Sequence, residues 1–164
     1  MAKQKCKNMT DQDFIKIVIT KGKQRLEKGE SPVLSIIVKD NKIVAEGHGT
    51  VDNFELSGHN DLNCINNACK KLQTYTLADC IMYSTIEPCS MCLGCASWAG
   101  LNKIVFGALL EDVPENHYEI DNYHAIEHAK RLHPNGKDME IVGGIMREEC
   151  KELMKDVKNW ILIK

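Results

Sequence analysis

The feature that most constrains the fold is a Pro-Cys-x-x-Cys stretch, formed by Pro88, Cys89 and Cys92, directly after a predicted strand at residues 80–85. Proline suits the first position of a helix, because its missing N–H group would be unpaired there in any case. Residues i and i+3 share one helix face, so both cysteine side chains can reach one point. The positive end of the helix dipole favours thiolates, which are zinc ligands. This stretch therefore predicts a metal site at a helix start.

Two cysteines rarely complete a zinc site, and His59 is the next candidate ligand. It lies thirty residues before Cys89, at the start of a helix predicted for residues 59–72. Helices that leave adjacent parallel strands on one face of a sheet can bring their starts together. His59, Cys89 and Cys92 would then leave a fourth position for water, which is typical of catalytic zinc. Zinc would lower the pKa of that water toward neutrality, and Asp61 could accept its proton and return it to a leaving group.

Hydrophobic periodicity and turn residues predict an alternation of strands and helices. The predicted helices cover residues 10–29, 59–72, 88 onward, 123–131 and 145–162, and the predicted strands cover residues 33–39, 42–48, 80–85, 103–108 and 139–142. The first two strands form a hairpin, and the later strand–helix–strand units imply right-handed parallel crossovers. The sequence therefore predicts an α/β fold, a three-layer α/β/α sandwich with a five-stranded mixed sheet.

Apolar patterning in two of these helices makes specific predictions about burial. The helix that starts at Pro88 is apolar nearly all round, which predicts burial on several sides. The closing helix is expected to turn Met146, Cys150, Leu153, Val157 and Trp160 inward. The cysteines expected to pack in the core rather than bind metal are Cys64, Cys69, Cys80, Cys95 and Cys150.

Charge and composition exclude several classes of protein. A net charge of −2 gives no overall attraction to nucleic acid or to an anionic membrane. No apolar run approaches transmembrane length, and the basic residues 1–7 lack the apolar segment of a secretory signal. Without such a signal, the eight cysteines favour metal binding or burial over disulfides. We expect a cytoplasmic protein that has no membrane partner.

The pairing of His59-x-Asp61 with Pro88-Cys-x-x-Cys resembles the signature of zinc-dependent nucleobase deaminases. The chain resembles the cytidine deaminase-like superfamily over about residues 36–108 and is most similar there to bacterial guanine deaminases and tRNA adenosine deaminases. Residues 140–150 resemble the last strand and helix of nucleoside and tRNA deaminases. The resemblance implies one zinc-dependent deaminase-like domain over residues 1–164, with Zn²⁺ as cofactor, a small-molecule nucleobase or nucleoside as substrate, and a homodimer.

Two departures from the family pattern concern Asp61 and Gly49. Asp61 stands where the family has glutamate, and its side chain is one methylene shorter, about 1.5 Å of reach. Gly49 falls where the family usually has an asparagine that binds the substrate. The residues that the resemblance places near the substrate are His48, Gly49, Glu55, Glu111 and Asp112.

The residues leave three functions open. The leading hypothesis is hydrolytic deamination of a guanine-like purine or a related heterocycle, with Asp61 as the catalytic proton carrier. A second is deamination of adenosine in a tRNA anticodon, which the closing helix favours and the lack of a basic stripe disfavours. A third is a zinc-stabilised scaffold protein that has lost catalysis, in which Asp61 is only an acidic residue favoured by the helix dipole.

Overall fold

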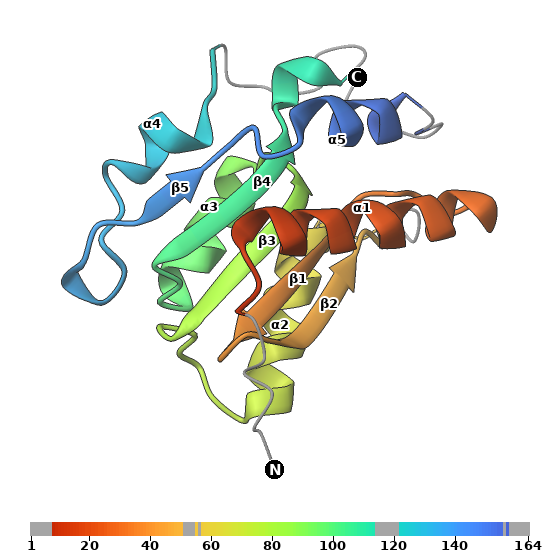
Figure 1. Ribbon diagram of the computed structural model, residues 1–164. Helices are drawn as coiled ribbons and strands as arrows, with labels where there is room; N and C mark the ends of the chain where they lie inside the picture. Colours follow the sequence, from red (N-terminus) through yellow and green to blue (C-terminus); the bar gives the residue numbers. More distant parts are fainter. Residues whose placement is uncertain (1–7, 51–54, 56, 114–121, 156, 158–164) are drawn as a thin grey trace.

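A five-stranded mixed sheet forms the centre of the computed structural model, which describes residues 8–50, 55, 57–113, 122–155 and 157 (Figure 1). Its strands are β1 (Leu34–Lys39), β2 (Lys42–His48), β3 (Cys80–Ile86), β4 (Lys103–Ala108) and β5 (Glu140–Val142), in the spatial order β2-β1-β3-β4-β5. β1 runs antiparallel to both β2 and β3, whereas β3, β4 and β5 run parallel. The predicted mixed sheet is confirmed.

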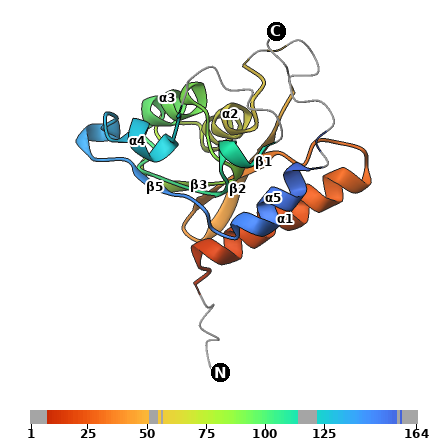
Figure 2. The same cartoon turned by 90° about the horizontal axis from the view of Figure 1, so that it is seen from above.

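Helices cover both faces of the sheet. They are α1 (Asp11–Glu27), α2 (Asn60–Leu72), α3 (Ser90–Trp98), α4 (Ala125–Ala129) and α5 (Arg147–Met154), with short 3₁₀ turns at Leu110–Asp112 and Pro134–Gly136. Figure 2 shows α1 and α5 on one face and α2, α3 and α4 on the other. The three-layer arrangement predicted from the sequence is therefore confirmed. Among the described residues, no helix combines the length and the hydrophobicity that a membrane span requires.

Strand residues alternate between two cores because successive side chains point to opposite faces. Ile37 and Met82 pack beneath α2 and α3, whereas Ile36 and Tyr83 pack beneath α1 and α5. All four side chains are at most 2% exposed. This alternation fixes which strand residues can reach the side of the sheet where α2 and α3 begin.

Two helix predictions differ from the structure. α5 begins at Arg147 because Met146 has a φ of 54°, in the left-handed region, and the helix ends at Met154 rather than near residue 162. Val157 lies beyond its end, and Trp160 is outside the described residues.

The helix α3 keeps one side exposed. Cys92 and Leu93 are buried, but Met91 is 42% and Trp98 is 92% exposed. The prediction of burial on several sides is wrong for these two residues. Among the described residues, α2, α4 and core side chains of the sheet pack against α3, and no further layer lies outside it.

Gly47 of β2 lets α2 approach the sheet closely. A Cβ atom at this position would overlap backbone atoms of Asn60 and Cys64 in the first turns of α2. Backbone atoms cannot move aside as a side-chain tip can. A glycine is therefore required here to place the start of α2 against β2.

We expect Gly47→Ala to reduce the free energy of unfolding by about 1–3 kcal/mol, because it overpacks this contact. The thermal midpoint should fall by roughly 2–4 °C for each kcal/mol. Gly94→Ala is the matched control: Gly94 lies in α3 with open space around its Cα. Alanine there should raise the midpoint, since glycine inside a helix is unfavourable by about 0.5–1 kcal/mol. Equal midpoints for the two variants would contradict this account.

Candidate metal centre and active site

Three potential ligand atoms meet where α2 and α3 begin. His59 is the N-cap residue of α2, and Cys89 is the N-cap residue of α3. The His59 Nδ1 atom lies 3.5 Å from Cys89 Sγ and 3.7 Å from Cys92 Sγ, and the two sulfur atoms are 3.4 Å apart. A tetrahedral zinc ion with ordinary bond lengths would hold such atoms about 3.6 Å (N to S) and about 3.8 Å (S to S) apart. The donor set therefore fits zinc in both chemistry and spacing.

The strands bring these helix starts together in a different way from the one predicted. The strands β2 and β3, which precede the two helices, are not neighbours, because β1 lies between them. Both run antiparallel to β1 and hence in the same direction, so their carboxyl ends lie at one edge of the sheet. The expectation of adjacent strands is wrong, but the convergence of the helix starts at that edge is confirmed.

Burial and mutual contact perturb the ligand side chains. Cys89 is 8% and Cys92 is 1% exposed. Hydrogen bonding from Cys92, assisted by His59, lowers the pKa of the Cys89 thiol. Hydrogen bonding to Cys89, together with burial, raises the pKa of Cys92, and the bond to Cys89 also raises the pKa of His59. The three side chains thus hydrogen-bond to one another, and a divalent cation bound between them would stabilise both thiolates.

Asp61 lies in the first turn of α2, only 2% exposed. Its Oδ1 atom accepts hydrogen bonds from the Ser35 hydroxyl and, at 2.8 Å, from Asn60 Nδ2. The carboxylate also contacts the Cys92 thiol, which links it to the ligand group. Burial, reinforced by the nearby Cys89 thiolate, raises the pKa of Asp61 to about 6. A carboxyl group in this environment can both accept and release a proton near neutrality.

His48 is the last residue of β2, and Gly49 and Glu55 belong to the segment that connects β2 to His59. The His48 carbonyl accepts a hydrogen bond from Asn63 Nδ2 at 2.8 Å, and Glu55 accepts one from the Thr50 hydroxyl at 2.7 Å. Backbone bonds from Thr50 to Gly58 and from Gly58 to Glu55 close this loop. The loop therefore lies at the sheet edge where the metal ligands meet, although residues 51–54 and 56 are outside the described part of the chain.

Glu111 and Asp112 make their described contacts with α5. Arg147 binds the Glu111 carboxylate at 2.7 Å and the Asp112 carboxylate at 2.8 Å. The Asp112 side chain is 2% exposed, and its ion pair with Arg147 lowers its pKa. Asp112 also accepts a hydrogen bond from its own helical turn, at Leu109 N. These contacts tie the end of β4 to α5, and none of them reaches the metal ligands.

Several polar residues in the site were not singled out from the sequence. Ser35 and Ser84 surround the Asp61 carboxylate together with Asn60. The sequence signal that could have identified the two serines is a polar residue within an otherwise apolar strand. Glu87 is 3% exposed and accepts hydrogen bonds from the backbone N–H groups of Leu110 and Ala125. It therefore fastens the segments after β4 to the start of α3.

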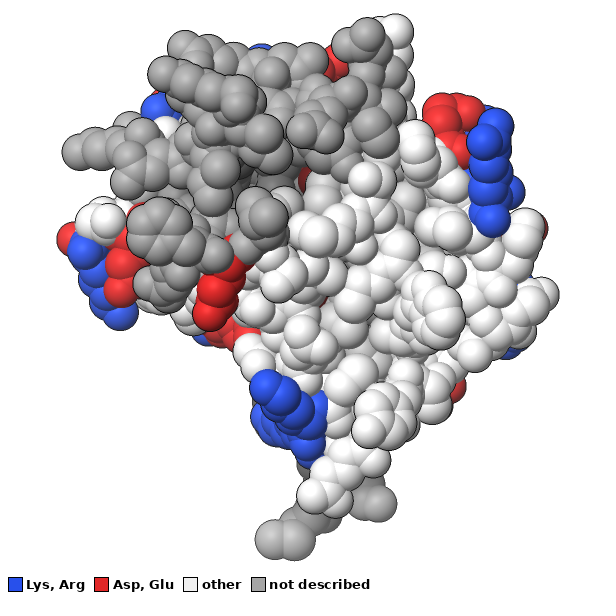
Figure 3. Space-filling model, turned by 180° about the vertical axis from the view of Figure 1, so that it is seen from behind, with Lys and Arg blue, Asp and Glu red and all other residues white. Residues whose placement is uncertain are grey.

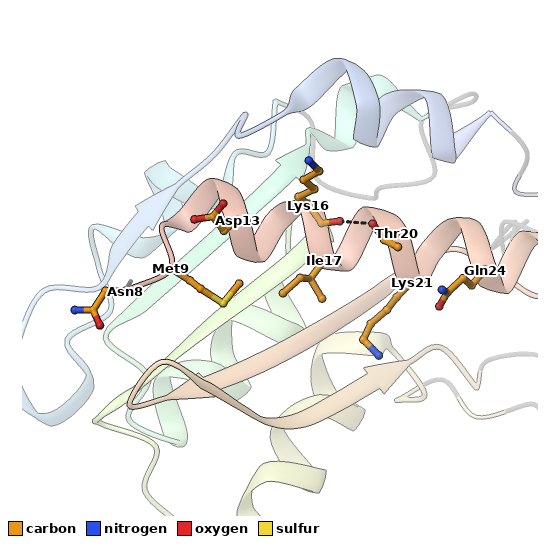
Figure 4. Close-up of a pocket in the computed structure, with 8 residues that line it drawn as sticks. All are labelled: Asn8, Met9, Asp13, Lys16, Ile17, Thr20, Lys21 and Gln24. Carbon is orange, nitrogen blue, oxygen red and sulfur yellow. Dashed lines mark hydrogen bonds between the residues drawn. The ribbon is translucent and has the colours of Figure 1, made fainter. Parts of the chain in front are cut away.

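A separate groove runs along α1, on the face of the sheet opposite to the metal ligands (Figure 4). The residues that line it are Asn8, Met9, Asp13, Lys16, Ile17, Thr20, Lys21 and Gln24. None of these described lining residues is a cysteine or a histidine. We therefore place the chemistry at the starts of α2 and α3.

We expect Cys89→Ser and Cys92→Ser to lose stoichiometric zinc, because each removes one of three protein ligands. Cys95→Ser is the matched control, since Cys95 lies one helical turn further along α3 and outside the ligand group. The measurement is metal content after dialysis, with the thermal midpoint before and after chelation. A ligand that binds only the folded state stabilises it by about 4 kcal/mol at a thousandfold excess over Kd. Zinc retained by both ligand variants would contradict the assignment.

Comparison with known sequences agrees with this geometry. A family model described as MafB19-like deaminase matches residues 9–154. The chain is 32% identical to a tRNA-specific adenosine deaminase of Aquifex aeolicus, over 73% of this chain and 88% of that protein. It is 36% identical to the guanine deaminase of Bacillus subtilis, over 65% of this chain and 70% of that protein. The resemblance predicted from the motifs is confirmed and extends well beyond residues 36–108.

Solved structures share the fold. The guanine deaminase of Nitrosomonas europaea superposes with a TM-score of 0.73 at 18% identity, covering 90% of this chain and 84% of that chain. The X-ray structure of the Bacillus subtilis guanine deaminase gives a TM-score of 0.59 at 30% identity, covering 71% of this chain and 85% of that chain. The cytidine deaminase-like fold expected from the sequence is therefore confirmed.

Proposed function

Because this chain belongs to the MafB19-like deaminase family, we propose that it is a zinc-dependent hydrolase that removes an amino group from a purine base or nucleoside as ammonia. One observation carries the proposal. Three ligand atoms at zinc spacing lie beside a buried carboxylate, and that carboxylate comes from the helix that His59 caps. A metal site built only for stability needs no such carboxylate and is usually closed by a fourth protein ligand.

Each residue of the site has a role in this reaction. Zinc would be held by His59 Nδ1, Cys89 Sγ and Cys92 Sγ, and when bound it would supply an activated water for attack on the ring carbon that bears the amino group. Asp61 accepts a proton from the water and delivers it to the neighbouring ring nitrogen. It then accepts the second proton from the new hydroxyl group on the ring carbon and transfers it to the amine, which leaves as ammonia. Oδ2 is the oxygen available for this transfer, because Oδ1 is occupied by Ser35 and Asn60.

The substrate is proposed to lie at the carboxyl ends of the strands, as ligands do in open α/β sheets. His48 ends β2 at this edge, Gly49 and Glu55 follow it, and all three are proposed to contact the base. Glu111 and Asp112 follow β4, which runs parallel to β3, and we propose that they flank the substrate at the same edge. Their ion pairs with Arg147 would hold this side of the site in place.

Surface charge favours a small-molecule substrate over tRNA. Figure 3 shows the face that carries α2, α3 and α4, and uncharged atoms occupy its centre while Lys and Arg lie toward its edges. Binding of an RNA backbone requires clustered basic side chains.

One observation supports the tRNA hypothesis. A tRNA-specific adenosine deaminase of Bacillus subtilis matches 85% of this chain, whereas the guanine deaminase of the same organism matches 65%.

We expect the zinc-loaded protein to release ammonia from at least one purine in a panel of free bases, nucleosides and a tRNA transcript. Asp61→Asn should bind zinc normally yet lower kcat by about 10²–10⁴-fold, the usual contribution of a positioned proton carrier. Glu152→Gln, a charge change on the exposed surface of α5, is the control. Turnover of the tRNA alone, abolished by salt, would support the second hypothesis. No turnover of any substrate by zinc-loaded protein would support the scaffold hypothesis.

We also propose that two copies associate through the exposed side of α3. Trp98 is 92% and Met91 is 42% exposed there, and Ile126 of α4, a helix in contact with α3, is 43% exposed. Exposed apolar side chains grouped on one face mark interaction surfaces. Sedimentation should give a dimer that Trp98→Glu converts to a monomer, whereas Tyr75→Glu, at an equally exposed aromatic residue outside α3, should leave it dimeric. A monomeric native protein would contradict this.

A further inference from the structure

We infer that Ser35, Asn60 and Ser84 form a positioning cluster that fits the site to an aspartate at position 61, and this inference rests on the proposed function. The cluster holds one carboxylate oxygen and leaves the other for proton transfer. Its members do not touch the substrate and act only through Asp61. The surroundings of position 61 would then be shaped for an aspartate, and this aspartate would not be a less active substitute for glutamate.

The cluster comes from three separate elements. Ser35 of β1 and Ser84 of β3 face each other directly across the antiparallel strands, and their hydroxyl oxygens are 3.1 Å apart. Asn60 opens α2, and its Nδ2 atom lies 2.6 Å from Ser35 Oγ and 3.3 Å from Ser84 Oγ. Both serines are fully buried, and Asn60 is 7% exposed. Polar side chains buried this deeply are stable only when they satisfy one another.

Donors in the cluster point toward Asp61 Oδ1. The Ser35 hydroxyl has one proton and donates it to Oδ1, while Asn60 donates a second hydrogen bond to the same oxygen at 2.8 Å. Ser84 completes the cluster by bonding Ser35 and Asn60. Two donors on one oxygen fix the plane of the carboxylate, because its free rotation would break both bonds.

The same contacts make the site specific for the shorter side chain. A glutamate at position 61 would place its carboxylate about 1.5 Å further from the α2 backbone. In a position that is 2% exposed, this extra length meets the Ser35 hydroxyl, which already touches Oδ1. Asp61→Glu alone should therefore lower activity, although glutamate is the residue that the family pattern leads one to expect.

The first test combines Ser35→Ala with Asp61→Glu in zinc-loaded protein. With Asp61 present, Ser35→Ala and Asn60→Ala should each lower kcat by about ten- to a hundredfold, the effect of a slightly misplaced catalytic group, with little change in KM. With Asp61→Glu present, Ser35→Ala should instead raise kcat, because it removes the obstructing hydroxyl. If Ser35 served only general stability, Ser35→Ala would lower kcat both with Asp61 and with glutamate at position 61. That result would overturn the inference.

The second test needs no activity. In protein labelled with ¹³C at aspartate carboxyl groups and loaded with zinc, the Asp61 resonance is identified by its loss in Asp61→Asn. Ser35→Ala and Asn60→Ala should both shift this resonance. Thr85→Val is the matched control, because Thr85 is a fully buried hydroxyl on the same strand as Ser84, bonded to the backbone of Leu34. It should leave the resonance in place.

The two measurements separate this inference from the proposed function. An Asp61 resonance that stays in place in both folded cluster variants overturns the cluster, even if the native protein is an active deaminase. Shifts in both variants support the cluster even if no substrate is turned over, a result that would count against the proposed function alone. Whether each variant is folded is judged from its own zinc content and thermal midpoint.

Discussion

The convergence of two helix starts at one edge of the sheet is the constraint on which the rest of the site depends. His59 and Cys89 are both N-cap residues, so each ligand is fixed by the helix that it begins. The ligand atoms can be within 4 Å of one another only if α2 and α3 begin side by side. The shared direction of β2 and β3, with β1 between them, provides that arrangement. The missing side chain of Gly47 then allows α2 to lie directly on β2.

Electrostatics explains why such a site should be a metal site. Two thiol groups and the carboxyl group of Asp61 are buried within one small region, and their negative forms repel one another. Burial of charge without compensation is very unfavourable. A divalent cation removes this cost for the thiolates, and the hydroxyl and amide donors around Oδ1 reduce it for Asp61. The polar cluster beneath Asp61 is thus part of the electrostatic balance of the site as well as its geometry.

Much of the fold and of the ligand set could be predicted from the sequence, for reasons that are local. Strand alternation, helix periodicity and the i, i+3 spacing of Cys89 and Cys92 depend only on backbone geometry, so the predicted strands and the metal ligands agree with the structure. The burial of α3 was not predictable in the same way. A uniformly apolar helix shows no preferred side, and the exposure of Trp98 depends on what packs against it. The start of α5 differed because Met146, its N-cap residue, adopts a left-handed conformation that no periodicity reveals.

The sequence by itself determined the chemistry that is available here: an imidazole, two thiols, and an aspartate two residues after the histidine. The sequence sets these residue types, and their spacing along the chain sets the helix face on which each one lies. Only the tertiary structure decided what surrounds them. Ser35, Asn60 and Ser84 are far apart along three elements and meet at Asp61 because strand pairing and helix docking bring them together. Glu111 and Asp112, which follow β4 in the chain, were likewise directed to Arg147 of α5 by packing. Contacts of this kind depend on three-dimensional proximity, which local sequence patterns do not encode.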